Sequence, residues 1–128
     1  MLMQNKSMIR PFLESALAPL PKIEVMDIGA SCINETPIYK ILLDQNLAHL
    51  NAFEGDPRHI EKIKSVYKDK VTLFNDFLGD GAQHTLYLAH PESGMTSLLK
   101  PNIKALQFFN NFENFGKIEK TEIVQTKK

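Results

Sequence analysis

The sequence is poor in the residues that mark several common classes of protein. It has one cysteine and no tryptophan in 128 residues, which excludes an internal disulfide framework and a zinc site built from several cysteines. No apolar run approaches the roughly 20 residues of a membrane-spanning helix, and charge and proline interrupt the N-terminal stretch too often for a clear signal peptide. We therefore expect a cytoplasmic protein with no membrane partner.

Charge and histidine spacing exclude further classes. The 15 basic and 15 acidic residues give a formal net charge of zero, which argues against a strongly basic nucleic-acid platform. We expect no nucleic-acid partner. His84 and His90 are too far apart in sequence for a compact pair of ligands, so we expect no metal site. Cys32 is expected to be a small loop residue and not a nucleophile.

The pattern of apolar and turn-forming residues predicts alternating strands and helices. A helical lead-in is expected over 1–22, with its helix at 8–20, and the main domain over 23–128. Strands are expected at 23–28, 50–54, 71–78, 84–89 and 122–126. Helices are expected from Pro37 to about 46, after a Thr36–Pro37 start signal, from Pro57 to 69, and over most of 98–115.

Helical spacing also predicts which side chains face the core. In the first two helices of the main domain these are Ile38, Ile41, Leu42, Ile60, Ile63, Val66 and Tyr67. A group of phenylalanines follows, namely Phe108, Phe109, Phe112 and Phe115. These rings could stack on nucleic-acid bases, but their spacing and the few basic neighbours favour core packing.

The order of the expected elements places the candidate site. Strands that alternate with helices form a mainly parallel sheet with flanking helices, and a β-hairpin is expected at the Asp80–Gly81 turn. Ligands of such sheets bind beyond the carboxyl ends of the strands. The candidate segments are therefore Asp27–Ser31, Glu54–Pro57 and Asn75–Phe77.

The first candidate segment is a glycine loop. Gly29 permits close approach of a ligand to the backbone, and the small Ala30 and Ser31 keep the gap open. Asp27 can accept hydrogen bonds from the loop N–H groups or from a ligand ammonium group. The alternative is an ordinary tight turn stabilised by the aspartate.

The other two segments carry polar side chains suited to a nucleoside. Glu54 can accept hydrogen bonds from both ribose hydroxyls, or it is a solvent-facing glutamate. Either Asn75 or Asp76 can meet an adenine amino group, or the strand continues unbroken into its hairpin. The loop after Gly29 has neither of the two further glycines of a dinucleotide site, and the sequence has no phosphate-binding loop motif. A ligand with adenine and ribose but no phosphate fits better, and S-adenosylmethionine is such a ligand.

Four motifs, in order, resemble those of FkbM-like methyltransferases: Asp27–Ser31, Ala52–Pro57, Leu78–Gly81 and Gly94–Leu99. The resemblance spans about 23–126. It implies a class I methyltransferase (Rossmann-like) fold in which Asp27, Gly29 and Glu54 contact S-adenosylmethionine, with Asp76 a further candidate. The role of the Gly94–Leu99 motif does not follow from the residues.

The chain departs from the family pattern at two places. Ser31 and Ile33 stand where many relatives have asparagine and glycine, although Glu35, Pro37 and Tyr39 resemble the loop of one branch. The family pattern also continues beyond Thr126, whereas this sequence has Lys127–Lys128. We therefore expect a fold that is incomplete at the C-terminus, with an exposed sheet edge near residue 126 for self-association or a complementing chain.

The resemblance implies methyl transfer from S-adenosylmethionine to a hydroxyl of a small molecule or glycan. The sequence predicts no catalytic base. Two alternatives remain open: a cofactor-binding or partner-binding fragment without activity, and a piece of a dinucleotide-binding enzyme.

Overall fold

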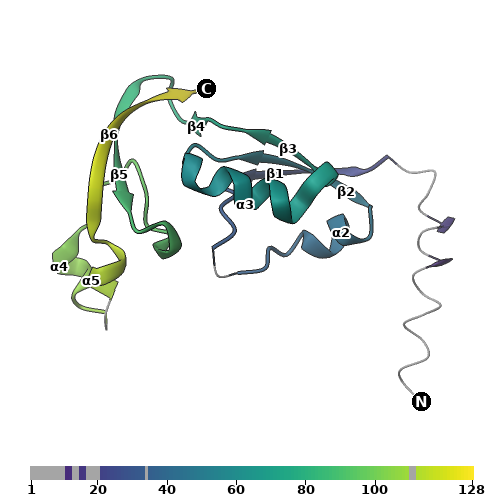
Figure 1. The fold of residues 1–128 in the computed structure, drawn as a ribbon, viewed down its shortest axis with the longest axis horizontal. Coiled ribbons are helices and arrows are strands. Elements are labelled where there is room, and N and C mark those ends of the chain that lie inside the picture. Colours follow the sequence, from purple (N-terminus) through teal and green to yellow (C-terminus); the bar gives the residue numbers. More distant parts are fainter. Residues whose placement is uncertain (1–10, 13–14, 17–20, 34, 110–111) are drawn as a thin grey trace, which may run out of the picture.

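The first sheet is small, parallel and covered by two helices on one side (Figure 1). The computed structural model describes residues 11–12, 15–16, 21–33, 35–109 and 112–128. The sheet has the order β1–β2–β3, with β1 at Ile23–Ile28, β2 at Ala48–Phe53 and β3 at Val71–Phe74. Both pairings are parallel. The helices α2 (Lys40–Asp44) and α3 (Pro57–Tyr67) connect the strands. The expected mixed α/β architecture with a parallel sheet is therefore confirmed.

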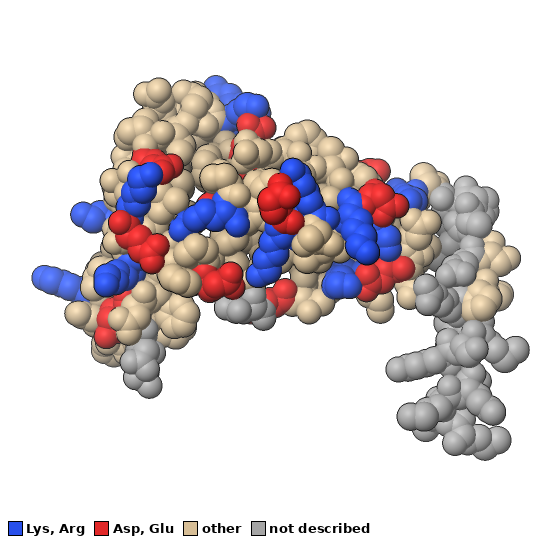
Figure 2. All heavy atoms as spheres, in the orientation of Figure 1, with Lys and Arg blue, Asp and Glu red and all other residues tan. Residues whose placement is uncertain are grey.

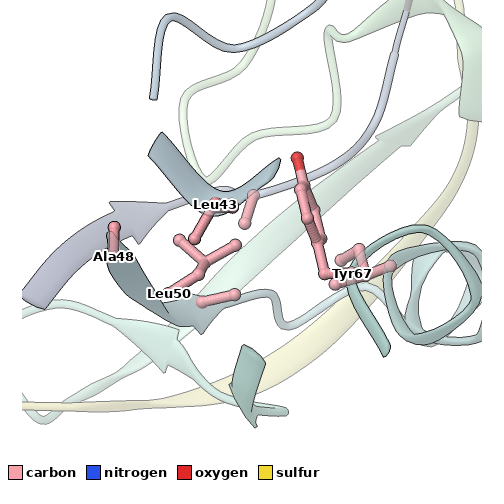
Figure 3. Packing of buried hydrophobic residues seen from close by; sticks show 7 residues of the cluster. Leu43, Ala48, Leu50 and Tyr67 are labelled. Atoms are coloured by element: carbon pink, nitrogen blue, oxygen red, sulfur yellow. The ribbon is translucent and has the colours of Figure 1, made fainter. Parts of the chain in front are cut away.

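The core lies between this sheet and its helices (Figure 3). Leu50 of β2, Leu43 of α2 and Ile63 of α3 are the largest fully buried side chains. The central strand β2 is the most buried because it has a neighbour on each side and helices over one face. The ring of Tyr67 packs beside these residues.

The helices differ in detail from the expectation. Residues 11–12 and 15–16 of the expected N-terminal helix are helical, and the rest of it lies outside the described residues. α2 begins at Lys40, and no side chain caps it. The helix start that was predicted from Thr36–Pro37 was therefore wrong. Ile38 and Ile41 are exposed, and Leu43 is buried in their place. This late start turns Leu43 toward the sheet.

α3 follows its prediction more closely. It begins at Pro57 with Asp56 as its N-cap, whose carboxylate accepts a hydrogen bond from the N–H of Arg58. Ile63 and Tyr67 are buried as expected, but Val66 is exposed. His59, which we did not expect in the interior, is buried instead.

The second sheet corrects the expected hairpin. Its order is β4–β6–β5, with β4 at Phe77–Leu78, β5 at Gln83–Ala89 and β6 at Ile118–Lys127. β5 is antiparallel to β6, and β4 is parallel to β6. The strand that follows the Asp80–Gly81 turn therefore does not return along its predecessor, because β6 lies between the two. The hairpin-like pair is β5 and β6, which are separated by 28 residues of sequence (90–117).

The open sheet edges also differ from the expectation. Thr126 and Lys127 pair with β4, and the N–H of Thr126 donates to the carbonyl of Ala82 at 3.0 Å. The strand therefore has neighbours on both sides near residue 126, where we expected an exposed edge. In the first sheet the edges are β1 and β3.

The face of the first sheet that points away from α2 and α3 is only partly polar. Asn51 donates to Glu24 at 2.7 Å, and His49 lies 2.8 Å from the hydroxyl of Thr72. Toward the carboxyl ends the face becomes apolar, since Met26 and Ile28 are exposed there. Elsewhere, Figure 2 shows acidic and basic side chains interspersed over the face that it presents. Among the described residues no helix is long and apolar enough to cross a membrane.

The phenylalanines expected in the core are exposed. The helices α4 (Ile103–Leu106) and α5 (Phe112–Phe115) are single turns, and Phe108, Phe109, Phe112 and Phe115 all lie at the surface. The prediction that these four phenylalanines pack in the core was therefore wrong, because two short helices offer no face broad enough to bury four rings.

Truncating the central core residue should destabilise the fold. For Leu50→Ala we expect a loss of about 3 kcal/mol in the free energy of unfolding, because a buried leucine leaves a cavity that its neighbours fill only partly. Chemical denaturation followed by circular dichroism measures this. The control is Ile38→Ala at a side chain that is 94% exposed, for which a change within about 0.5 kcal/mol is expected. Equal effects would contradict this description of the core.

The turn before β5 should make stability depend on pH. Its Asp80 carboxylate lies 2.8 Å from His84 Nε2 and accepts from the N–H of Ala82, and these contacts lower the pKa of Asp80 to about 2. A carboxyl group with a lowered folded-state pKa contributes stability above its unfolded pKa of about 3.9 and loses that contribution as pH falls toward 2. The stability difference between the wild type and Asp80→Asn should therefore shrink over this range. A constant difference in denaturation titrations would contradict the assignment.

Candidate functional site

A cavity of about 290 Å³ lies where the three expected segments meet. Parallel strands end at the same edge of a sheet, so the loops that follow them converge there. Of the sequence-predicted residues, Gly29, Ser31, Glu54 and Asp76 line the cavity. Its opposite wall comes from Leu86 of β5 and from the segment that follows β5, through Pro91, Gly94, Thr96, Ser97 and Leu98.

Gly29 adopts a conformation that suits an open loop. Its φ is +77°, in the region that glycine tolerates best, and no atom lies within 4 Å of the place where a Cβ would stand. The N–H groups of Gly29 and Ala30 both donate to the carbonyl of Phe53, at 2.8 and 3.2 Å. The loop is therefore held to the end of β2 while its outer side stays free for a ligand.

Asp27 and Ala30 do not line this cavity. The carboxylate of Asp27 accepts a hydrogen bond from the hydroxyl of Tyr39, and burial together with this bond raises the pKa of Tyr39 above its ordinary value. Ala30 is buried in the core. Asp27 thus ties the loop to the segment before α2, which gives Tyr39 a structural role that its sequence motif did not reveal.

Glu54 is the central acidic group of the cavity. It lies just after β2 and is 7% exposed, and its Oε1 accepts a hydrogen bond from the N–H of Asp56 at 2.8 Å. No described residue forms a hydrogen bond with its Oε2. Burial raises the pKa of Glu54, against the lowering by the Asp56 N–H. A buried carboxylate with an available oxygen is well suited to accept hydrogen bonds from a ligand.

The structure distinguishes Asp76 from Asn75. Asp76 lines the cavity and pairs with Lys127 Nζ at 2.7 Å, whereas Asn75 is exposed and lies outside the cavity lining. The next residue, Phe77, also lines the cavity and packs directly on Gly55. A Cβ at position 55 would overlap the Phe77 ring, so glycine here lets the ring reach its place in the wall.

Sequence reasoning missed two parts of the site. His59 lines the cavity and lies 3.9 Å from the carboxylate of Asp56; its only sequence signal was its place in the first turn of α3. The Gly94–Leu99 motif also had no assigned role. In the structure Gly94 adopts a positive φ of 69°, and Ser97 pairs with Tyr87 of β5. The motif thus folds back onto β5 and forms the opposite wall.

Arg58 holds that wall to the first sheet. Its guanidinium binds both carboxylate oxygens of Asp56, the shortest bond being 2.6 Å. The same group donates to the carbonyl of Ala89 at 3.1 Å and to the hydroxyl of Thr96 at 3.2 Å. Burial raises the pKa of Asp56, but the bonds from Arg58 more than offset this and keep it below its ordinary value.

Electrostatically the cavity is acidic. Its lining includes the carboxylates of Glu54, Asp56 and Asp76 and the imidazole of His59, and no lysine or arginine from the described residues. No group of three or more metal-ligating side chains is found in the part of the chain that the structure describes. Asp56 is paired with Arg58 and Asp76 with Lys127, so Glu54 is the lining carboxylate that has no ion-pair partner among the described residues. Its negative charge favours a neutral or cationic ligand and disfavours phosphates.

Comparisons with protein-family models, curated proteins and solved structures found no match for this chain.

Loss of the Arg58 side chain should destabilise the protein. For Arg58→Met we expect a cost of about 3 kcal/mol, because the buried carboxylate of Asp56 loses its charged partner. Thr96→Val, which removes only the hydroxyl between Arg58 and the N–H of Ala89, should cost about 1 kcal/mol. Thr96→Ser keeps the hydroxyl and is the matched control. Chemical denaturation measures the free energy of unfolding of all three variants. An Arg58→Met variant as stable as the wild type would refute the role of Arg58 in holding the wall.

Proposed function

We propose that the chain binds S-adenosylmethionine in this cavity and is the cofactor-binding part of a methyltransferase of the class I, FkbM-like type. The observation that carries the proposal is the buried carboxylate of Glu54 after β2, which has no ion-pair partner among the described residues, whereas Asp56 and Asp76 of the same lining are paired with Arg58 and Lys127. S-adenosylmethionine has a ribose, an adenine and a positive sulfonium centre, and it has no phosphate.

The proposed pose follows from the positions of the polar groups. Glu54 would accept hydrogen bonds from the ribose hydroxyls, using Oε2 and the remaining capacity of Oε1. Asp76 would accept from the adenine amino group, and Phe77 would pack against the adenine. The open side of Gly29 and the Ser31 hydroxyl would lie along the rest of the cofactor.

The acidic lining also separates this proposal from a dinucleotide site. A pyrophosphate needs N–H groups or cations at the glycine loop, and Gly29 is followed by Ala30 and Ser31 without further glycines. Placing two phosphate charges beside the carboxylate of Glu54, which has no described ion-pair partner, would be unfavourable.

The bound cofactor would supply an electrophilic methyl group, which a nucleophile such as a substrate hydroxyl attacks by direct displacement. The residues of this chain would contribute alignment and exclusion of water. The proposed acceptor is a hydroxyl of a small molecule or glycan. No described residue is assigned as the catalytic base.

Calorimetric titration with S-adenosylmethionine and, separately, NAD tests the proposal. We expect saturable binding of S-adenosylmethionine only, weakened about tenfold or more by Glu54→Ala, because a hydrogen bond to a charged group contributes about 1.5–3 kcal/mol. The control is Glu61→Gln on the exposed surface of α3. Burial raises the pKa of Glu54, and protonation removes the charge that accepts the ribose hydrogen bonds. As pH is lowered, the affinity for S-adenosylmethionine should therefore begin to fall at a pH higher than about 4.3, the ordinary pKa of glutamate.

Three outcomes would decide between the proposals. Absence of binding by a folded chain would refute the cofactor site, and preferential binding of NAD would favour a dinucleotide enzyme. Binding without transfer of a labelled methyl group to any of a panel of hydroxylated acceptors would favour a cofactor-binding chain without activity of its own.

A further inference from the structure

Four phenylalanines form an exposed cluster, here called the phenylalanine patch. Phe108, Phe109, Phe112 and Phe115 are 90%, 59%, 49% and 44% exposed. Their rings contact one another in series, with centroids 6.0, 6.1 and 5.6 Å apart. Figure 1 shows α4 and α5 together at one end of the β5–β6 pair, away from the first sheet. Exposed apolar clusters of this kind mark interaction surfaces.

Three lysines lie close in sequence to the phenylalanine patch. Lys100, Lys104 and Lys117 are exposed, and none of them forms an ion pair with a described residue. The segment 99–117 has these three lysines and one acidic residue, Glu113, which gives it a formal charge of +2, whereas the whole chain has a net charge of zero. Glu92, which lines a surface pocket together with Phe115, is paired with Lys62 at 3.8 Å. The segment that carries the patch therefore combines exposed aromatic rings with an excess of positive charge.

This combination distinguishes between two kinds of partner. A second copy that met the patch through a two-fold axis would bring the same surface against itself, lysines included, and like charges in contact are unfavourable. An anionic lipid bilayer offers negative headgroups to the lysines and an apolar boundary to the rings.

We propose that the phenylalanine patch docks the protein onto the surface of an anionic lipid bilayer. The rings of Phe108 and Phe109, the most exposed pair, enter the boundary between headgroups and acyl chains, while the lysines contact the headgroups. Such contact reaches only about 5–10 Å into the bilayer and needs no spanning helix. It therefore revises the sequence-based expectation of no membrane partner, which considered only apolar runs long enough to span. The inference is independent of the proposed cofactor site.

The patch is separable from the contacts that hold this region together. Leu106 packs on Gly116, and the side chain of Asn102 caps α4 by accepting from the N–H of Ala105 at 3.1 Å. Substitution of Phe108 or Phe109 removes none of these contacts. Variants at these two positions should therefore keep the native circular dichroism spectrum.

The absence of tryptophan from the sequence permits a specific reporter. Phe108→Trp places a single indole at the most exposed position of the patch, and its emission should shift to shorter wavelength when the ring enters lipid. The probes are vesicles of phosphatidylcholine alone and vesicles that also contain phosphatidylserine. We expect the shift with the anionic vesicles, quenching by lipids brominated on their acyl chains, and weaker binding at high salt.

Sedimentation of the full chain with the same vesicles tests the two contributions separately. The double variant Phe108→Ser/Phe109→Ser should weaken binding about tenfold or more, because it removes two apolar groups. The triple variant Lys100→Gln/Lys104→Gln/Lys117→Gln should abolish the preference for phosphatidylserine. The matched control is Ile38→Ser at another exposed apolar side chain, which should bind as the wild type does.

Three results would overturn the proposal. The first is a folded chain that binds neither kind of vesicle. The second is a double phenylalanine variant that binds anionic vesicles as well as the wild type. The third is a dimer in solution that the double variant dissociates while vesicle binding is absent, which would identify a second copy as the partner.

Discussion

The ion pair between Asp56 and Arg58 is the interaction on which the arrangement of the two sheets depends. Asp56 follows β2 and is buried, so its carboxylate needs a charged partner. Arg58 provides that partner from the first turn of α3, and it also donates to Ala89 at the end of β5 and to Thr96 in the segment that follows. The carboxylate of Asp56 therefore caps α3, while the guanidinium of Arg58 neutralises this buried charge and links the second sheet to the first. The cavity exists in the space between them.

The chemistry of the cavity follows from the same arrangement. The parallel sheet brings the ends of β1, β2 and β3 to one edge, and the segment after β5 closes the space from the opposite side. Because Arg58 is directed toward Asp56 and Thr96, it does not line this cavity. Glu54 is thereby left as a buried carboxylate with no described cation in the lining, which is the basis for proposing a phosphate-free adenosine ligand.

Local patterns predicted the elements that depend on local physics. The run of residues in β1 was predicted with its full bounds, and α3 was predicted from its proline start and apolar stripe, because backbone preference and side-chain period agree there. The gathering of Gly29, Ser31, Glu54 and Asp76 was predictable because strand ends of a parallel sheet converge. The late start of α2 was not, since its buried face is chosen by packing on β2. The partner of β5 was not predictable either, because β6 lies distant in sequence.

The sequence by itself determined the alternation of strands and helices, the parallel sheet and the acidic residues at its carboxyl edge, because these depend on residue type and spacing. Only the tertiary structure decided which carboxylates face the cavity. The carboxylate of Asp27 accepts a hydrogen bond from Tyr39, while Glu54 and Asp76 line the cavity. It also left the four phenylalanines exposed, although their spacing favoured a core. Periodicity shows that side chains share a face, but whether that face is covered depends on other parts of the chain.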